Sequence, residues 1–84
     1  MITKMFSVYD SKTEAYMAPF FMGARGQAIR SFVDTAGEGT SMIAKHPEDF
    51  TLFELGDFDD ATASLSLHPT PVSLGIAIEL LPKK

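Results

Sequence analysis

Polar and apolar residues alternate with a period of two along several segments of the chain, and this pattern predicts β-strands. Residues 2–9 predict a first strand. Residues 15–23 predict a short edge strand or a buried extended segment, because Pro19 cannot donate a hydrogen bond to a sheet. Residues 50–67 predict a β-hairpin, with Gly56 as a bulge or bend. Its second strand alternates Ala63, Leu65 and Leu67 on one face with Ser64, Ser66 and His68 on the other.

Two further segments complete the predicted fold. Residues 73–81 predict a closing strand with Ile76, Ile78 and Leu80 inward, and a short helical turn can begin at Pro47. Apolar residues recur at helical spacing within residues 25–39, which predicts a helix ended by two glycines. The face expected to be apolar carries Ala28, Ile29, Phe32, Val33 and Ala36. The sum is an α+β fold: a mostly antiparallel sheet of about four or five strands with one helix packed on it.

Composition places the chain among small folded proteins. Its 84 residues predict one domain over residues 1–84, and 45% of them are hydrophobic. The chain has no cysteine, so neither a disulfide nor a thiolate zinc site supports the fold. No apolar run approaches the roughly 20 residues that cross a bilayer, and the first ten residues do not form a signal peptide. We therefore expect no membrane partner, and the absence of cysteine fits a reducing cytoplasm.

The net charge of −4 is unevenly distributed. Residues 1–45 carry five basic and four acidic side chains, whereas residues 46–84 carry two basic and seven acidic ones. A protein that holds DNA through many phosphate contacts usually has a basic surface, which the average charge argues against. A local basic surface on the N-terminal half stays possible.

Acidic residues gather between Lys45 and Ser64, and three interpretations of them are open. Asp57, Asp59 and Asp60 can bind Mg²⁺, but the spacing of a calcium loop is missing, and Glu79 is the only evident further ligand. The second interpretation is a solvated acidic hairpin that keeps a sheet edge from pairing. The third is a recognition surface for a basic partner. We expect no metal and no cofactor, and the candidate partner-binding residues are Glu54, Asp57, Asp59 and Asp60.

Signals for catalysis are weak. Ser41, His46 and Asp49 can be combined into a hydrolytic triad on paper, but no serine lies in a GxSxG pattern. Residues 23–26, GARG, lack the spacing of a phosphate loop, although Arg25 and two glycines at a helix start suit an anion. We expect no catalytic residue and a protein that is not an enzyme.

The chain has nine aromatic residues, more than one small core can hide completely. Aromatic side chains on a sheet beside Lys or Arg bind single-stranded nucleic acid by base stacking and phosphate contacts. The candidate nucleic-acid-binding residues are Lys4, Tyr9, Lys12, Tyr16, Arg25 and Arg30. Two alternatives are an aromatic core with tyrosines at its edge and an interface between two copies of the chain.

Several segments, among them FSVYDSK, GQAIRSFVD, HPEDF and PVSLGIAIE, together resemble the small non-structural protein of gokushovirus-type microviruses, which are phages with circular single-stranded DNA. The resemblance covers residues 4–80, although the turn after Asp60 lacks the glycine often expected there. It implies a non-virion role in the host cytoplasm, associated with viral genome replication or the switch to single-stranded DNA synthesis. It supplies no catalytic residue.

From the residues and the resemblance together, we expect a homodimer that binds single-stranded DNA. The alternative is an adaptor whose acidic hairpin docks on a viral or host replication protein.

Overall fold

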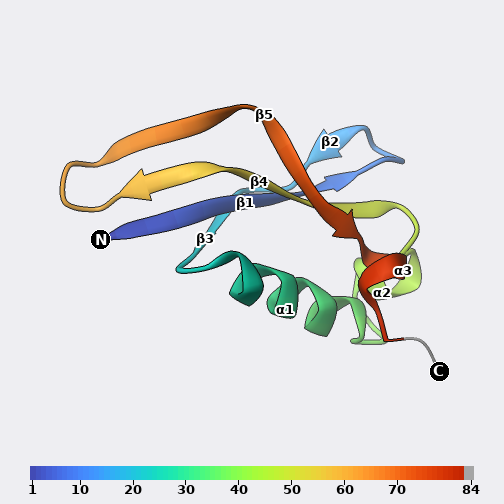
Figure 1. Ribbon diagram of the computed structural model, residues 1–84. Helices are drawn as coiled ribbons and strands as arrows, with labels where there is room; N and C mark the ends of the chain where they lie inside the picture. The colour runs from blue at the N-terminus through green and yellow to red at the C-terminus, as the bar shows by residue number, and fades with distance from the viewer. Residues whose placement is uncertain (83–84) are drawn as a thin grey trace.

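Five strands form one antiparallel sheet, and three helices lie on one side of it in the computed structural model, which describes residues 1–82 (Figure 1). The strands are β1 (Ile2–Asp10), β2 (Ala15–Tyr16), β3 (Phe20–Met22), β4 (Phe50–Asp59) and β5 (Ser64–Ile76). The helices are α1 (Arg25–Ala36), α2 (Met42–Lys45) and α3 (Ala77–Leu80). The predicted α+β class, with a mostly antiparallel sheet and one main helix packed on it, is confirmed.

The two edges of the sheet differ. The strand order is β2-β1-β4-β5, and β3 also pairs with β1, so β2 and β3 share one edge of β1. β2 contains two residues and β3 contains three, and Pro19 lies between them. We call this side of the sheet the split edge. The opposite edge is formed by β5 alone, which is 13 residues long.

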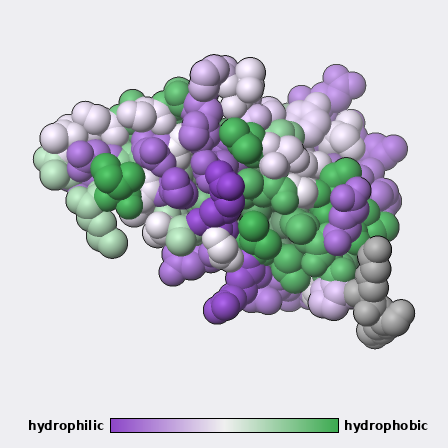
Figure 2. Space-filling model, in the orientation of Figure 1, coloured by the Kyte–Doolittle hydropathy of each residue, from purple (hydrophilic) through white to green (hydrophobic). Residues whose placement is uncertain are grey.

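The hydrophobic core lies between the sheet and the helices. Phe6 and Leu52 from the two central strands are fully buried, and Phe32 of α1 packs against them in one cluster. The cluster also contains Val8, Ala28, Ala36, Ile43, Phe50 and Ala77. The predicted apolar face of the helix is therefore largely confirmed, because three of its five residues are buried. On the surface, hydrophobic atoms gather over the side that carries α3 and the end of β5 (Figure 2).

The predicted hairpin is confirmed, and Gly56 explains how its strands approach each other. β4 and β5 pair antiparallel from Asp59 and Ser64 at the turn, and the register shifts between Glu54 and Gly56. A Cβ atom at position 56 would lie 2.2 Å from the backbone oxygen of Ser66. Only glycine permits this approach, because real Cβ atoms essentially never come within 3.0 Å of another heavy atom. The bulge predicted at Gly56 therefore lies at a close approach of the two strands.

The end of the chain differs from its prediction. β5 continues from the predicted hairpin without a break to Ile76, and residues 77–80 form α3 instead of the end of a closing strand. Ile78, predicted to point inward, is 50% exposed, and Ala77 is the buried residue of α3. Gly75 adopts a φ of +135°, a conformation that L side chains rarely adopt, and β5 ends one residue later at Ile76. Alternation within residues 73–81 did not reveal this break.

The ends of α1 and α2 differ from the prediction in two details. The short helix α2 precedes Pro47 rather than beginning there, and Ser41 caps it by accepting a 3.0 Å hydrogen bond from the Ala44 amide. α1 ends at Gly37 as predicted, but the φ of Gly37 is −86° rather than left-handed. The chain therefore continues from α1 into α2 without the left-handed turn that glycine usually provides.

Candidate nucleic-acid interface

The side of the sheet that faces away from the helices is rich in aromatic and aliphatic residues. Val8 and Leu52 belong to the core, so their neighbours Tyr9 and Phe53 point to the opposite side. We call this side the open face, since no helix of residues 1–82 packs on it (Figure 1). Its large side chains are Met5, Tyr9, Tyr16, Phe21, Phe53, Phe58, Leu65 and Leu67.

Three aromatic rings meet at one end of the open face. The ring centroids of Tyr9 and Tyr16 lie 4.8 Å apart, because the two residues are register partners in β1 and β2. Phe53 of β4 meets both rings edge-on, at 5.6 Å from Tyr16 and 6.4 Å from Tyr9. Tyr16 is 48% exposed. We call this group, in which Tyr9 and Phe53 are partly exposed as well, the tyrosine cluster.

Lys12 is the basic residue nearest to this cluster along the chain. It lies in the turn between β1 and β2, whose backbone is held by a 2.9 Å hydrogen bond from the Lys12 amide to Oδ1 of Asp10. Lys12 forms no ion pair among the described residues. The structure therefore brings Tyr9, Tyr16 and Lys12 into one short hairpin.

A second apolar group lies at the other end of the open face. Phe21 of β3 and Phe58 of β4 have ring centroids 5.6 Å apart, and Phe58 pairs in register with Leu65 of β5. Leu67 continues the row and is 65% exposed, while Leu65 is 57% exposed. The alternation predicted for this strand is correct, but it places both leucines on the open face rather than in the core.

Two of the predicted DNA-contacting bases form ion pairs on the helix side of the sheet. Lys4 is the register partner of Asp57, and Nζ of Lys4 lies 3.5 Å from Oδ1 of Asp57. Nε of Arg25, at the start of α1, lies 3.0 Å from Oε1 of Glu54. Neither base is therefore grouped with the tyrosine cluster.

Glu54 forms the most buried of these ion pairs. Its side chain is 2% exposed, and Oε2 lies 2.7 Å from Nε2 of His68 while Oε1 accepts the hydrogen bond from Arg25. The hydrogen bond from Arg25 lowers the pKa of the Glu54 carboxyl, against the opposing effect of burial. The same contact raises the pKa of Arg25. Glu54 thus joins α1, β4 and the bend of β5, and its burial removes it from the predicted partner-binding surface.

The other predicted acids lie towards the turn of the β4–β5 hairpin, which projects beyond the helices at one end of the sheet (Figure 1). The amino group of Met1 lies 2.7 Å from Oδ1 of Asp60 and 3.9 Å from Oδ1 of Asp59. Asp57 pairs with Lys4 as described above. Arg30 lies on the exposed side of α1 and makes no ion pair among residues 1–82. Lys4, Arg25 and Arg30 therefore lie on the helix side of the sheet. Lys12 lies in the β1–β2 turn, where it lines a hollow with Met42 of α2 and residues of the turn before β4.

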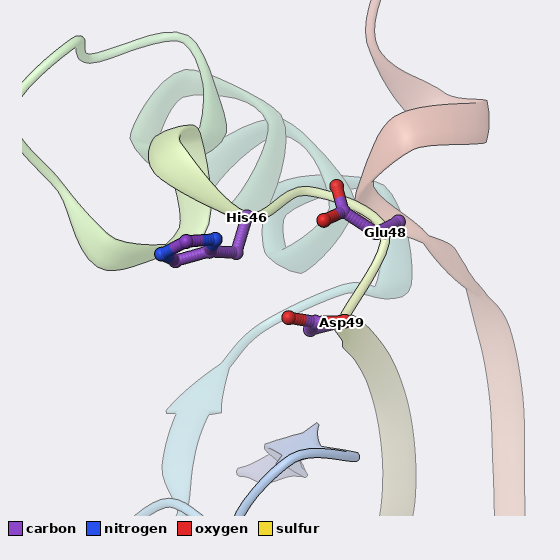
Figure 3. A group of neighbouring side chains, drawn as sticks. All are labelled: His46, Glu48 and Asp49. Carbon is purple, nitrogen blue, oxygen red and sulfur yellow. The ribbon is translucent and has the colours of Figure 1, made fainter.

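One group of possible metal ligands lies in the turn before β4. A ligand atom from each of His46, Glu48 and Asp49 falls within 4.8 Å of the other two, and the three side chains project to the same side of the turn (Figure 3). They border a hollow of about 340 Å³ that Lys12 also lines. One imidazole and two carboxylates can ligate a divalent cation. Exposed groups of this kind are common without one, so this arrangement does not establish a metal site.

The hydrolytic triad drawn from the sequence is not assembled. Ser41 Oγ donates a 2.6 Å hydrogen bond to the Thr35 carbonyl and accepts one from the Ala44 amide, so it acts as a helix cap. His46 and Asp49 make no side-chain hydrogen bond to it.

The burial of Glu54 is the feature that the sequence reasoning missed. The signal was present, because Glu54 alternates with Leu52 and Phe50 and therefore shares their core-facing side of β4. A charged residue in register with core residues predicts a partner of opposite charge within reach. Arg25 at the start of the helix is that partner.

The fold and the open face define a small α+β protein whose single sheet is covered by helices on one side only. A comparison with known protein families identifies the family of this chain. The family model described as Phage ORF5 protein matches residues 3–80. The chain therefore belongs to the Phage ORF5 protein family and is a phage accessory protein, so the phage origin implied by the resemblance is confirmed. The comparisons with curated proteins and with solved structures give no match. No helix among residues 1–82 has the length and apolar character needed to span a bilayer.

Proposed function

We propose that this phage protein binds single-stranded DNA without catalysing a reaction, and that the tyrosine cluster on the open face is the stacking site. The observation that carries the proposal is the contact of Tyr9, Tyr16 and Phe53 on a sheet face that no helix covers. Bases stack on such rings regardless of sequence, which suits a protein that binds genomes of single-stranded DNA. The resemblance to microvirus proteins supports a role in genome replication in the host cytoplasm.

In the proposed complex, few basic side chains contact DNA phosphates. Lys12 supplies the nearest cation, whereas Lys4 and Arg25 are occupied by Asp57 and Glu54. Affinity falls with salt in proportion to the number of phosphates that the protein neutralises. We therefore expect weak binding with a shallow salt dependence, in which stacking contributes most of the affinity.

Fluorescence anisotropy of a labelled oligothymidylate at about 50 mM salt tests the proposal. Tyr16→Ala should weaken binding about 5- to 100-fold, since one base stack is worth about 1–3 kcal/mol, whereas Tyr16→Phe should retain most of the affinity. Lys12→Glu should weaken binding, and the matched charge reversal Arg30→Glu on the helix side should leave it almost unchanged. Absence of binding by the native chain would exclude this function.

Arg25→Glu is unsuitable as a probe of DNA binding. It would place a second carboxylate beside the buried Glu54 and disturb the fold. Any loss of binding in that variant would mix two effects.

A second candidate function is docking of the hairpin end on a basic surface of a viral or host replication protein. The supporting observation is that Asp57, Asp59 and Asp60 all lie at the hairpin end of the sheet, where Asp60 is 54% exposed. Opposite charge would accelerate such an encounter. Asp60→Lys should then slow association with a purified replication initiator, and an unchanged association rate would count against docking through this surface.

A further inference from the structure

The edge strand β5 has a segment with unusual properties for an exposed edge. Residues 64–67 pair with β4 on one side only, and they make no other backbone hydrogen bond among residues 1–82. Their sequence, SLSL, contains no charge and no proline. Natural proteins usually protect an edge with Lys, Pro, a bulge or a covering element, and this segment has none of these.

Both leucines of the segment are exposed on the open face. Leu65 is 57% exposed and Leu67 is 65% exposed, beside the partly buried Phe58. An exposed apolar row next to free backbone amides and carbonyls suits the addition of another strand. Two copies of this chain carry the same net negative charge, which disfavours contact between their hairpins. However, Asp57, the acid in register with Ser66, lies on β4 and therefore one strand away from the exposed edge of β5.

The sequence around Ser66 indicates which strand can pair with the exposed edge of β5. The sequence Ser64-Leu65-Ser66-Leu67-His68 is nearly the same in both directions. In antiparallel pairing centred on Ser66, Leu65 of one copy lies opposite Leu67 of the other, and Ser66 lies opposite Ser66. A two-fold axis through this point places the leucines of both copies on the same side of the joined sheet. Each Leu65 then lies opposite a Leu67, and no two charged residues face each other at the contact.

We infer that the edge segment 64–67 of β5 pairs with the same segment of a second copy, with Ser66 at the two-fold axis. The resulting dimer has one continuous sheet, and the open faces of the two copies join into one apolar surface. Leu65 of each copy then packs beside Leu67 of the other at the centre of this surface. The pairing does not depend on DNA binding, because the tyrosine cluster lies at the other end of the open face.

Sedimentation at about 200 µM protein is the first test, since dimer formation depends on concentration. The native chain should have twice the monomer mass of 9.2 kDa. Leu67→Lys should return it to the monomer with an unchanged circular dichroism spectrum, because the side chain is largely exposed. The control Met42→Lys changes a 61% exposed residue on α2 and should leave the dimer intact.

Cysteine cross-linking tests the register, and the chain has no other cysteine to interfere. Paired Cα atoms of opposite strands lie about 4.5–5.5 Å apart, within the range that a disulfide spans. Ser66→Cys should therefore form a covalent dimer on mild oxidation. Ser64→Cys is the matched control, because its two copies would lie about 13 Å apart along the strands.

Three results would overturn the inference. The first is a native chain that stays monomeric at about 200 µM. The second is a dimer that persists in Leu67→Lys. The third is cross-linking at position 64 that equals or exceeds cross-linking at position 66, since this would indicate random collision or another register.

Discussion

Replacing Glu54 with glutamine tests whether the buried ion-pair group holds the helix layer to the sheet. The carboxylate is 2% exposed and contacts Arg25 at 3.0 Å and His68 at 2.7 Å. Glutamine keeps the size and one acceptor oxygen but removes the charge. The perturbation therefore acts on the charged hydrogen bonds and leaves the packing nearly unchanged.

The expected loss follows from the number and environment of these contacts. A hydrogen bond to a charged group contributes about 1.5–3 kcal/mol, and a neutral one contributes about 0.5–1.5 kcal/mol. Arg25 and His68 retain contact with water, with side chains 52% and 32% exposed, so the lower part of these ranges applies. We expect Glu54→Gln to lower the free energy of unfolding by about 1–3 kcal/mol at pH 7. In a domain of this size, each kcal/mol corresponds to roughly 4–8 °C in Tm.

The effect should depend on pH with a defined sign. The pKa of Glu54 in the folded protein lies below its usual value because of the hydrogen bond from Arg25. The stabilisation is therefore complete above the unfolded pKa of about 4.3 and is lost as the pH falls through the folded pKa. The native chain should lose stability over this range, and Glu54→Gln should lose less.

Urea unfolding followed by circular dichroism at several pH values between about 7 and 3 measures both effects. Asp57→Asn is the matched control, because it removes the same charge from the half-exposed pair with Lys4 and should cost about 0.5 kcal/mol or less. Equal stability of Glu54→Gln and the native chain at pH 7 would refute the reasoning. A difference between them that did not shrink at acid pH would refute it as well.

Two further predictions concern the hairpin. Gly56→Ala should destabilise the protein by about 1–3 kcal/mol or more, because its Cβ would overlap the backbone of Ser66, while Gly39→Ala, with no atom nearby, should be almost neutral in the same urea assay. Ala63→Gly should stabilise it by about 0.5–1 kcal/mol, because Ala63 has a φ of 61° and glycine adopts this conformation without strain. A lower Tm of the Ala63→Gly variant would contradict the second expectation.

Local patterns predicted most of the fold. Alternation located β1 and the β4–β5 hairpin, and helical spacing located α1, because each element buries one face against the same core. The closing strand was wrong because alternation placed Ile76, Ile78 and Leu80 inward, whereas α3 buries Ala77 and packs Leu80 against the core after the unusual backbone at Gly75. Such a change of direction depends on long-range packing that residue alternation does not encode.

The candidate site was only partly predictable. Tyr9 and Tyr16 were correctly grouped, since a turn of a few residues makes them neighbours across β1 and β2. Residue type alone did not reveal that Lys4 and Arg25 would be paired with acids from β4. These pairs join residues 29 or more positions apart, so only the sheet register and the helix position bring them together.

The split edge sets a limit on how far assembly through strands can proceed. A sheet with two receptive edges can add copies at both ends and grow into a fibre. Here one edge is divided between strands of two and three residues with Pro19 between them, so it offers no continuous ladder to an incoming strand. Only the β5 side can accept a neighbour. Growth by strand addition through β5 would therefore stop at two chains, because each dimer would present only split edges to further copies.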